Sequence, residues 1–154
     1  MEFINWWAVL AATVLAFVLG GIWYGPVFGK AWMAALGKTE EDIEPSPRPF
    51  VISFFTALVT AIVLAWLIKS LGIYAWPEGA LLGLVTGIGF IATAMASDSA
   101  FCGWSLKLFL IQSGYRVLYS ILMGALLAPT AVSLTIQLVS AAGWAFPTKS
   151  RSMS

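Results

Sequence analysis

Four long apolar runs constrain how this chain can fold. They cover about residues 4–24, 50–68, 79–97 and 107–128. A helix needs about 20 mainly apolar residues to cross a bilayer, and each run is close to that length. Inside a bilayer every backbone N–H and C=O group must be paired, and a helix pairs them within its own segment. The sequence therefore predicts an all-α integral membrane bundle, with a four-span domain over residues 1–128.

Composition and charge exclude several functions. Of the 154 residues, 60% are hydrophobic and 10% are charged, whereas a soluble domain is about 25% charged. The net charge of +1 offers no basic surface to a nucleic-acid backbone. The chain has no histidine, which excludes haem and zinc sites built on histidine and Ser-His-Asp triads. Its single cysteine, Cys102, excludes a CxxC pair. We expect a chain surrounded by lipid that binds no nucleic acid, cofactor or metal and is not an enzyme.

The segment after Pro129 has two alternative interpretations. The fourth run ends at Pro129, and residues 130–146 then form another uncharged stretch that is more polar than the other runs. Its length and polarity fit either a tilted fifth span or an interfacial helix. A polar tail follows at residues 147–154.

Basic residues favour the five-span alternative and predict an orientation. With five spans, one side of the membrane carries six basic residues and the other carries only Lys69, whereas four spans divide them four to three. The six residues are Lys30, Lys38, Arg48, Lys107, Lys149 and Arg151. Because cytoplasmic loops are enriched in Lys and Arg, we expect the N-terminus outside and the polar tail in the cytoplasm.

The connection between the first two spans is the one long loop. Its first part, about residues 28–36, places Phe28, Trp32 and Leu36 on one face, which predicts a short interfacial helix. Four acidic residues follow Thr39, namely Glu40, Glu41, Asp42 and Glu44. Carboxylates can bind Ca²⁺ or Mg²⁺, but this spacing matches no EF-hand. A solvated helix cap is therefore the favoured interpretation.

Three stretches of the chain resemble a known family. They are INWWAVLAATVLAFVLGGIWYGPVFGKAWMAALGKTEEDI, EGALLGLVTGIGFIATA and SLKLFLIQSGYRVLYSILMGALL. The most specific parts are WYGP-x-FGKAW at Trp23–Trp32 and SLKLFLI-x-x-GY at Ser105–Tyr115. Over residues 4–127 the chain is similar to the bacterial family called domain of unknown function seventeen-sixty-one. The resemblance implies a small membrane protein of four helices with no established activity, and it does not extend to the fifth segment. We expect the protein in a bacterial inner membrane.

Small residues repeat every four positions on the third and fourth runs, so each set lies on one helix face. The two sets are Gly79, Gly83 and Gly87 on the third run and Ser120, Gly124 and Ala128 on the fourth. Such stripes let helix backbones approach closely in lipid, where no hydrophobic force draws helices together. Gly21 and Gly25 form a shorter stripe at the end of the first run. Packing within the chain is favoured over contact with a second copy.

Arg116 is the one charged residue inside a predicted span. A central Arg is costly in a bilayer, so its side chain must face protein, water or a partner. It shares a helix face with three polar residues, Gln112, Tyr119 and Ser120. The side chain reaches back toward Lys107, and Asp98 lies at that end of the preceding helix. An Asp98–Arg116 pair, direct or bridged, would either fix the helix register or mark a functional site.

Two functions of different classes follow from these features. The first is a non-enzymatic accessory bundle that packs, forms a homo-oligomer or joins a larger membrane complex through its glycine stripes. The second is a small transporter or channel component, in which the polar seam of Gln112, Arg116, Tyr119 and Ser120 lines a route for an anion or polar solute. An intramembrane enzyme ranks third, because the chain offers few groups for catalysis.

Overall fold

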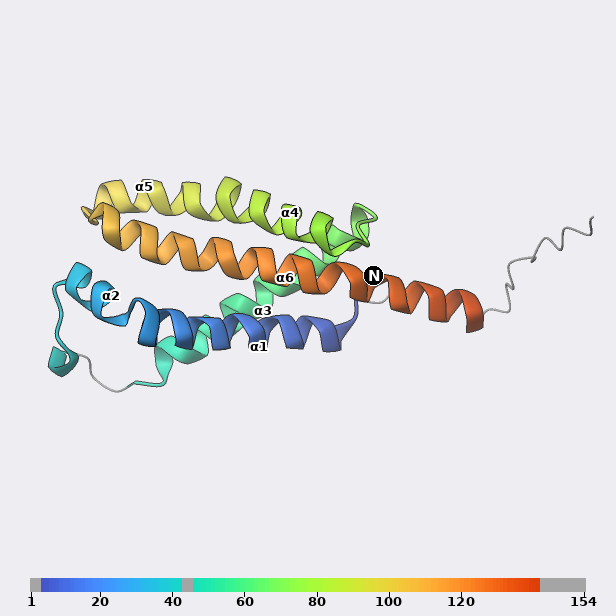
Figure 1. The fold of residues 1–154 in the computed structure, drawn as a ribbon, viewed down its shortest axis with the longest axis horizontal. Helices are drawn as coiled ribbons and strands as arrows, with labels where there is room; N and C mark the ends of the chain where they lie inside the picture. Colours follow the sequence, from blue (N-terminus) through green and yellow to red (C-terminus); the bar gives the residue numbers. More distant parts are fainter. Residues whose placement is uncertain (1–3, 43–45, 142–154) are drawn as a thin grey trace, which may run out of the picture.

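The computed structural model describes residues 4–42 and 46–141, which are helical apart from short connections (Figure 1). The α-helices are α1 (Trp6–Ile22), α2 (Gly29–Leu36), α3 (Arg48–Ser70), α4 (Trp76–Thr86), α5 (Thr93–Cys102) and α6 (Leu106–Ala141). The π-helical segments are η1 (Trp23–Val27) and η3 (Gly87–Ala92), and η2 (Glu40–Asp42) is a 3-10 turn.

Four helical stretches in the described residues are long and apolar enough to cross a membrane. They are Trp6–Val27, Arg48–Ser70, Trp76–Cys102 and Leu106–Ala131. The first joins α1 to η1, and the third joins α4, η3 and α5 into one run. The all-helical fold and the four apolar helices predicted from the sequence are thereby confirmed.

Helix α6 is the centre of the bundle and contacts each of the five other α-helices. In Figure 1, α4 and α5 lie along one side of α6, α1 lies along the other, and α3 crosses obliquely. Residues 23–42 and the turn at residues 103–105 lie together at one end, which we call the loop end. The start of α1 and the turn between α3 and α4 lie toward the opposite end.

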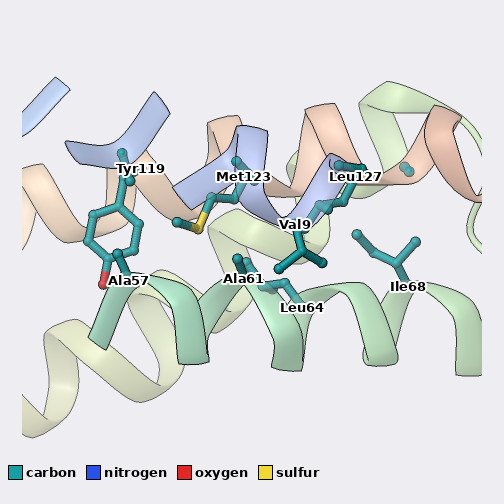
Figure 2. Close-up of a cluster of buried hydrophobic side chains, with 12 residues drawn as sticks. Val9, Ala57, Ala61, Leu64, Ile68, Tyr119, Met123 and Leu127 are labelled. Atoms are coloured by element: carbon teal, nitrogen blue, oxygen red, sulfur yellow. The ribbon is translucent and has the colours of Figure 1, made fainter. Parts of the chain in front are cut away.

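The hydrophobic core lies between α1, α3 and α6 (Figure 2). Small residues recur every four positions on one face of α1, at Ala8, Ala12 and Ala16, and α3 presents Ala57 and Ala61. Larger side chains fill the remaining space, namely Val9, Leu64, Ile68, Tyr119, Met123 and Leu127. The alternation of small and large residues lets three helices interdigitate.

Helices α4 and α6 approach each other through glycine. A Cβ atom added at Gly79 would collide with the Gly124 carbonyl, and one added at Gly83 would collide with the Ser120 carbonyl and lie 2.8 Å from the Ile121 Cα atom. One added at Gly87 would lie 3.1 Å from the Val117 Cα atom. The two backbones are therefore in direct contact along this face. The glycine stripe is occupied within the chain.

Helix α6 continues through Pro129, so the expectation that the fourth helix ends there is wrong. Proline removes one backbone hydrogen bond, whereas ending a helix in apolar surroundings would leave several carbonyl groups unpaired. Residues 130–141 continue α6, and the Thr130 hydroxyl donates a hydrogen bond to the Leu127 carbonyl at 2.7 Å. Residues 142–146 and the polar tail lie outside the described part of the chain. A fifth span over residues 130–146 stays a prediction.

Large apolar side chains cover the outside of the bundle. Trp7 is 81% exposed on α1, Phe90 is 73% exposed on η3 and Phe101 is 91% exposed on α5. The outer face of α3 is lined in the same way, with Phe55 and Val59 more than half exposed. Apolar surface of this extent matches a lipid environment and is rare on soluble proteins. The four helices are thus compatible with a membrane protein.

The α4–α6 contact generates a prediction about stability. Gly83→Ala places a methyl group against the backbone of α6, so the helices must separate, and we expect the free energy of unfolding to fall by about 1–3 kcal/mol. Gly89→Ala is the matched control, because a Cβ atom there meets no atom within 4 Å. Unfolding by SDS titration in detergent, followed by far-UV circular dichroism, measures both variants. Equal stability of the two variants would contradict the assigned contact.

Candidate functional site around Arg116

The first span ends in an irregular turn that brings aromatic rings toward α6. Gly25 has non-helical dihedral angles, with φ −98° and ψ −105°, and Pro26 follows it. The Phe28 N–H donates to the Trp23 carbonyl at 2.8 Å, which closes the turn before α2 begins. Trp23 contacts the Phe28 ring at a centroid distance of 4.6 Å, and Tyr24 contacts the Trp32 ring at 5.1 Å. The WYGP-x-FGKAW run therefore folds back on itself.

Two hydrogen bonds from aromatic side chains join α6 to the first span. The Trp23 Nε1–H group donates to the Ile111 carbonyl at 3.0 Å, and the Tyr115 hydroxyl donates to the Ala16 carbonyl at 3.0 Å. Gly20 makes room for the second bond, because a Cβ atom there would lie 2.9 Å from the Tyr115 hydroxyl oxygen. Each helix thus donates one bond to a backbone carbonyl of the other. The two most specific sequence runs meet at this contact.

Arg116 lies on α6 next to this aromatic contact. Its guanidinium group is within electrostatic range of Tyr24 and Tyr115. The Tyr115 ring contacts the Tyr24 ring at 5.2 Å and the Tyr119 ring at 5.1 Å, both edge to face. Three tyrosines from η1 and α6 therefore form one connected cluster beside the guanidinium group.

Arg116 has no ion pair with any residue that the structure describes. Its side chain is partly buried, and its Nε atom is buried without a hydrogen-bond partner. Asp98 is exposed on α5 and forms no direct ion pair with Arg116, whereas a bridged Asp98–Arg116 pair stays a prediction. Arg116 is ten residues from the start of α6 and Asp98 is four from the end of α5, so their Cα atoms differ in depth by about 9 Å along these antiparallel helices.

The predicted polar seam divides between different neighbours. Ser120 is fully buried against α4, and its hydroxyl donates to the Arg116 carbonyl of its own helix at 2.8 Å. Tyr119 is buried in the core between α1, α3 and α6. Gln112 is partly buried one turn before Arg116. These residues share a helix face, but two of them are engaged in helix packing.

Sequence reasoning missed the residues that surround Arg116. Trp23 and Tyr24 fit the pattern of aromatic residues at a membrane interface, and that pattern hides their contacts with α6. Gly21 and Gly25 have open space beside them, whereas Gly20 makes the close contact. A usable signal was present, since Gly20 extends the four-residue spacing of Ala8, Ala12 and Ala16.

The acidic cluster of the loop forms a small solvated turn. The Thr39 backbone N–H and hydroxyl both donate to Asp42 Oδ2, each at 2.8 Å. These bonds stabilise the carboxylate and lower the pKa of Asp42 below its ordinary value. In the described part of the chain, no group of three His, Cys, Asp or Glu residues is arranged to hold a metal ion, and Glu44 lies outside that part.

The Tyr115 hydrogen bond generates a prediction. Tyr115→Phe keeps the ring contacts and removes only the bond to the Ala16 carbonyl, so we expect a loss of about 0.6–1.7 kcal/mol in the free energy of unfolding. Tyr74→Phe is the control, because Tyr74 is exposed in the turn between α3 and α4. SDS titration compares the two variants with the wild type. A Tyr115→Phe protein as stable as the control would show that the bond contributes nothing.

Comparison with known proteins gives a family match over nearly the same residues as the resemblance found in the sequence. No curated protein and no solved structure matches the chain. The family described as protein of unknown function (DUF1761) matches residues 7–128, which include both specific runs and end just before Pro129. The match covers most of the chain and confirms the resemblance found in the sequence. The chain therefore belongs to this family of unknown function.

Proposed function

We propose that this protein is a multi-span membrane protein that acts as a non-enzymatic accessory bundle. The observation that carries the proposal is the tightly packed interior. Ala61 and Met123 are fully buried between α1, α3 and α6, and the backbones of α4 and α6 are in contact on the adjacent face of α6. A rigid bundle of this kind suits a protein that supports or binds other membrane components.

The internal use of glycine limits how the bundle can associate. Gly79, Gly83 and Gly124 are buried between α4 and α6 and cannot also face a second chain. A homo-oligomer or a larger complex would therefore use the exposed apolar faces of α1, α3 or α5. This differs from the association through glycine stripes that the sequence pattern indicates.

Transport is the second candidate, and Arg116 is the observation that favours it. A partly buried guanidinium group with an unpartnered Nε atom could attract an anion. Two of the four seam residues are nevertheless engaged in packing, since Ser120 lies against α4 and Tyr119 lies in the core. The accessory function is therefore the better supported of the two.

A flux assay separates the two candidates. We expect liposomes containing the purified protein to release chloride, phosphate and potassium no faster than protein-free liposomes, because buried side chains and the α4–α6 backbone contact occupy the spaces between the helices. Arg116→Ala should leave these rates unchanged, and Lys107→Ala, which removes an exposed charge at the start of α6, is the matched control. Anion flux that depends on Arg116 but not on Lys107 would instead support transport.

The charge distribution supports an orientation. The loop end carries Lys30, Lys38 and Lys107, and Arg48 begins α3 there, whereas Lys69 is the one basic residue at the opposite end among the described residues. Under the positive-inside rule, the loop end would face the cytoplasm of a bacterial inner membrane and the N-terminus would lie outside. Location of the polar tail depends on whether residues 130–146 cross the membrane.

Cysteine labelling tests this orientation. Cys102 is exposed at the end of α5, so we expect a membrane-impermeant maleimide to label it only after cells are permeabilised. Tyr74→Cys in a Cys102→Ser background should be labelled in intact cells, because it lies at the opposite end. Labelling with the reverse pattern would contradict the orientation. Ser150→Cys in the same background tests the fifth span, which would be excluded by labelling from outside.

A further inference from the structure

The Arg116 Nε atom is the buried side-chain polar atom that has no hydrogen-bond partner among the residues that the structure describes. Buried polar groups are normally paired, so such an atom calls for an explanation. Neither Asp98 nor any other described acid satisfies it. The Arg116 side chain as a whole is only partly buried, and its other guanidinium nitrogens are not among the buried unpartnered atoms of the described residues.

We propose that Arg116 binds a phosphate group, and that the phosphate belongs to the headgroup of an anionic phospholipid at the loop end or to a free phosphate ion. The inference concerns binding at one position and does not depend on the accessory function. A bound phosphate requires no route across the bundle.

The depth of the guanidinium group fits a phosphate at the membrane boundary. Tyr24, which lies within electrostatic range of Arg116, is three residues before the end of the span Trp6–Val27. The Tyr24 ring contacts Trp32 on α2, beyond the end of that span. An Arg side chain also reaches toward the N-terminal end of its helix, which for α6 is the loop end. The charge therefore lies nearer the headgroup region than the position of Arg116 in the sequence indicates.

The chemistry of the surrounding groups favours an oxyanion. A guanidinium group presents its N–H donors in a planar fork that matches two phosphate oxygens. The Tyr24 hydroxyl has no hydrogen-bond partner among the described residues and can donate a further bond to the same group. The Tyr115 hydroxyl is already bonded to the Ala16 carbonyl, which holds its ring in place beside the site. The cluster thus offers donors on a fixed frame.

The experiment measures thermal unfolding of the purified full-length protein in a phosphate-free maltoside detergent, followed by tryptophan fluorescence. Phosphatidylglycerol, diacylglycerol and inorganic phosphate are titrated separately, and diacylglycerol serves as the lipid without a phosphate. A molecule that binds only the folded state raises the midpoint in a saturable way. We expect phosphatidylglycerol or inorganic phosphate to raise it and diacylglycerol to leave it unchanged. Whichever of the two acts at the lower concentration identifies the source of the phosphate.

Variants assign the effect to Arg116. Arg116→Met should weaken the apparent affinity for the phosphate-containing probe about tenfold or more, because it removes a charge-assisted bidentate contact. Lys107→Met removes the same charge from an exposed position at the loop end and should keep the wild-type affinity. Tyr24→Phe keeps the ring and should weaken the affinity several-fold.

The unliganded Arg116→Met protein provides a check on folding. Because the substitution removes an unpartnered buried nitrogen, its unfolding midpoint without any probe should equal or exceed that of the wild type. If that variant does not fold, Tyr24→Phe and Arg116→Lys decide the matter by their weaker response. Equal stabilisation of the wild type, Arg116→Met and Tyr24→Phe by every probe, or an equal response to diacylglycerol and phosphatidylglycerol, would overturn the proposal.

Discussion

Direct contact between the backbones of α4 and α6 is the interaction on which the rest of the bundle depends. In lipid, helices gain nothing by hiding apolar side chains from each other, so close packing must hold them together. The glycine face of α4 lies on Ser120 and Gly124 of α6, where added Cβ atoms would meet backbone atoms. This contact orients α6, which in turn contacts the five other α-helices. The orientation of α6 directs its other faces toward α1 and α3, where the core forms, and fixes the position of Arg116.

The aromatic contact at the loop end uses that orientation. Trp23 and Tyr115 donate hydrogen bonds to carbonyl groups of each other's helices, and Gly20 provides the space that the Tyr115 hydroxyl requires. The same contact places the ring of Tyr24 beside Arg116. A charged side chain within an apolar span thereby lies within electrostatic range of tyrosines and has no ion pair with a described carboxylate. Its buried Nε atom has no hydrogen-bond partner among the described residues, and the proposed phosphate site is built on this feature.

Much of the fold could be predicted from the sequence, but the site could be predicted only in part. The four-residue spacing of small residues indicates which faces pack, because spacing along one helix is a local property. This holds for Gly79 and Gly83 on α4 and for the stripe that contains Gly124 on α6. Arg116 was recognised because a charge in an apolar run is costly wherever it points. The prediction of a helix end at Pro129 was wrong, because the hydrogen bond lost at a proline costs less than the unpaired backbone groups of a helix end in apolar surroundings.

Residue type and local spacing are enough to establish that this chain is helical, where its four apolar helices lie and that Arg116 is the charge within them. The packing of the helices determines that Asp98 forms no direct ion pair with Arg116 and that tyrosines from two helices form a ring cluster within its electrostatic range. These features depend on how helices far apart in the chain are rotated and offset against one another. No local pattern specifies that rotation, because it is set by the sum of the contacts around α6.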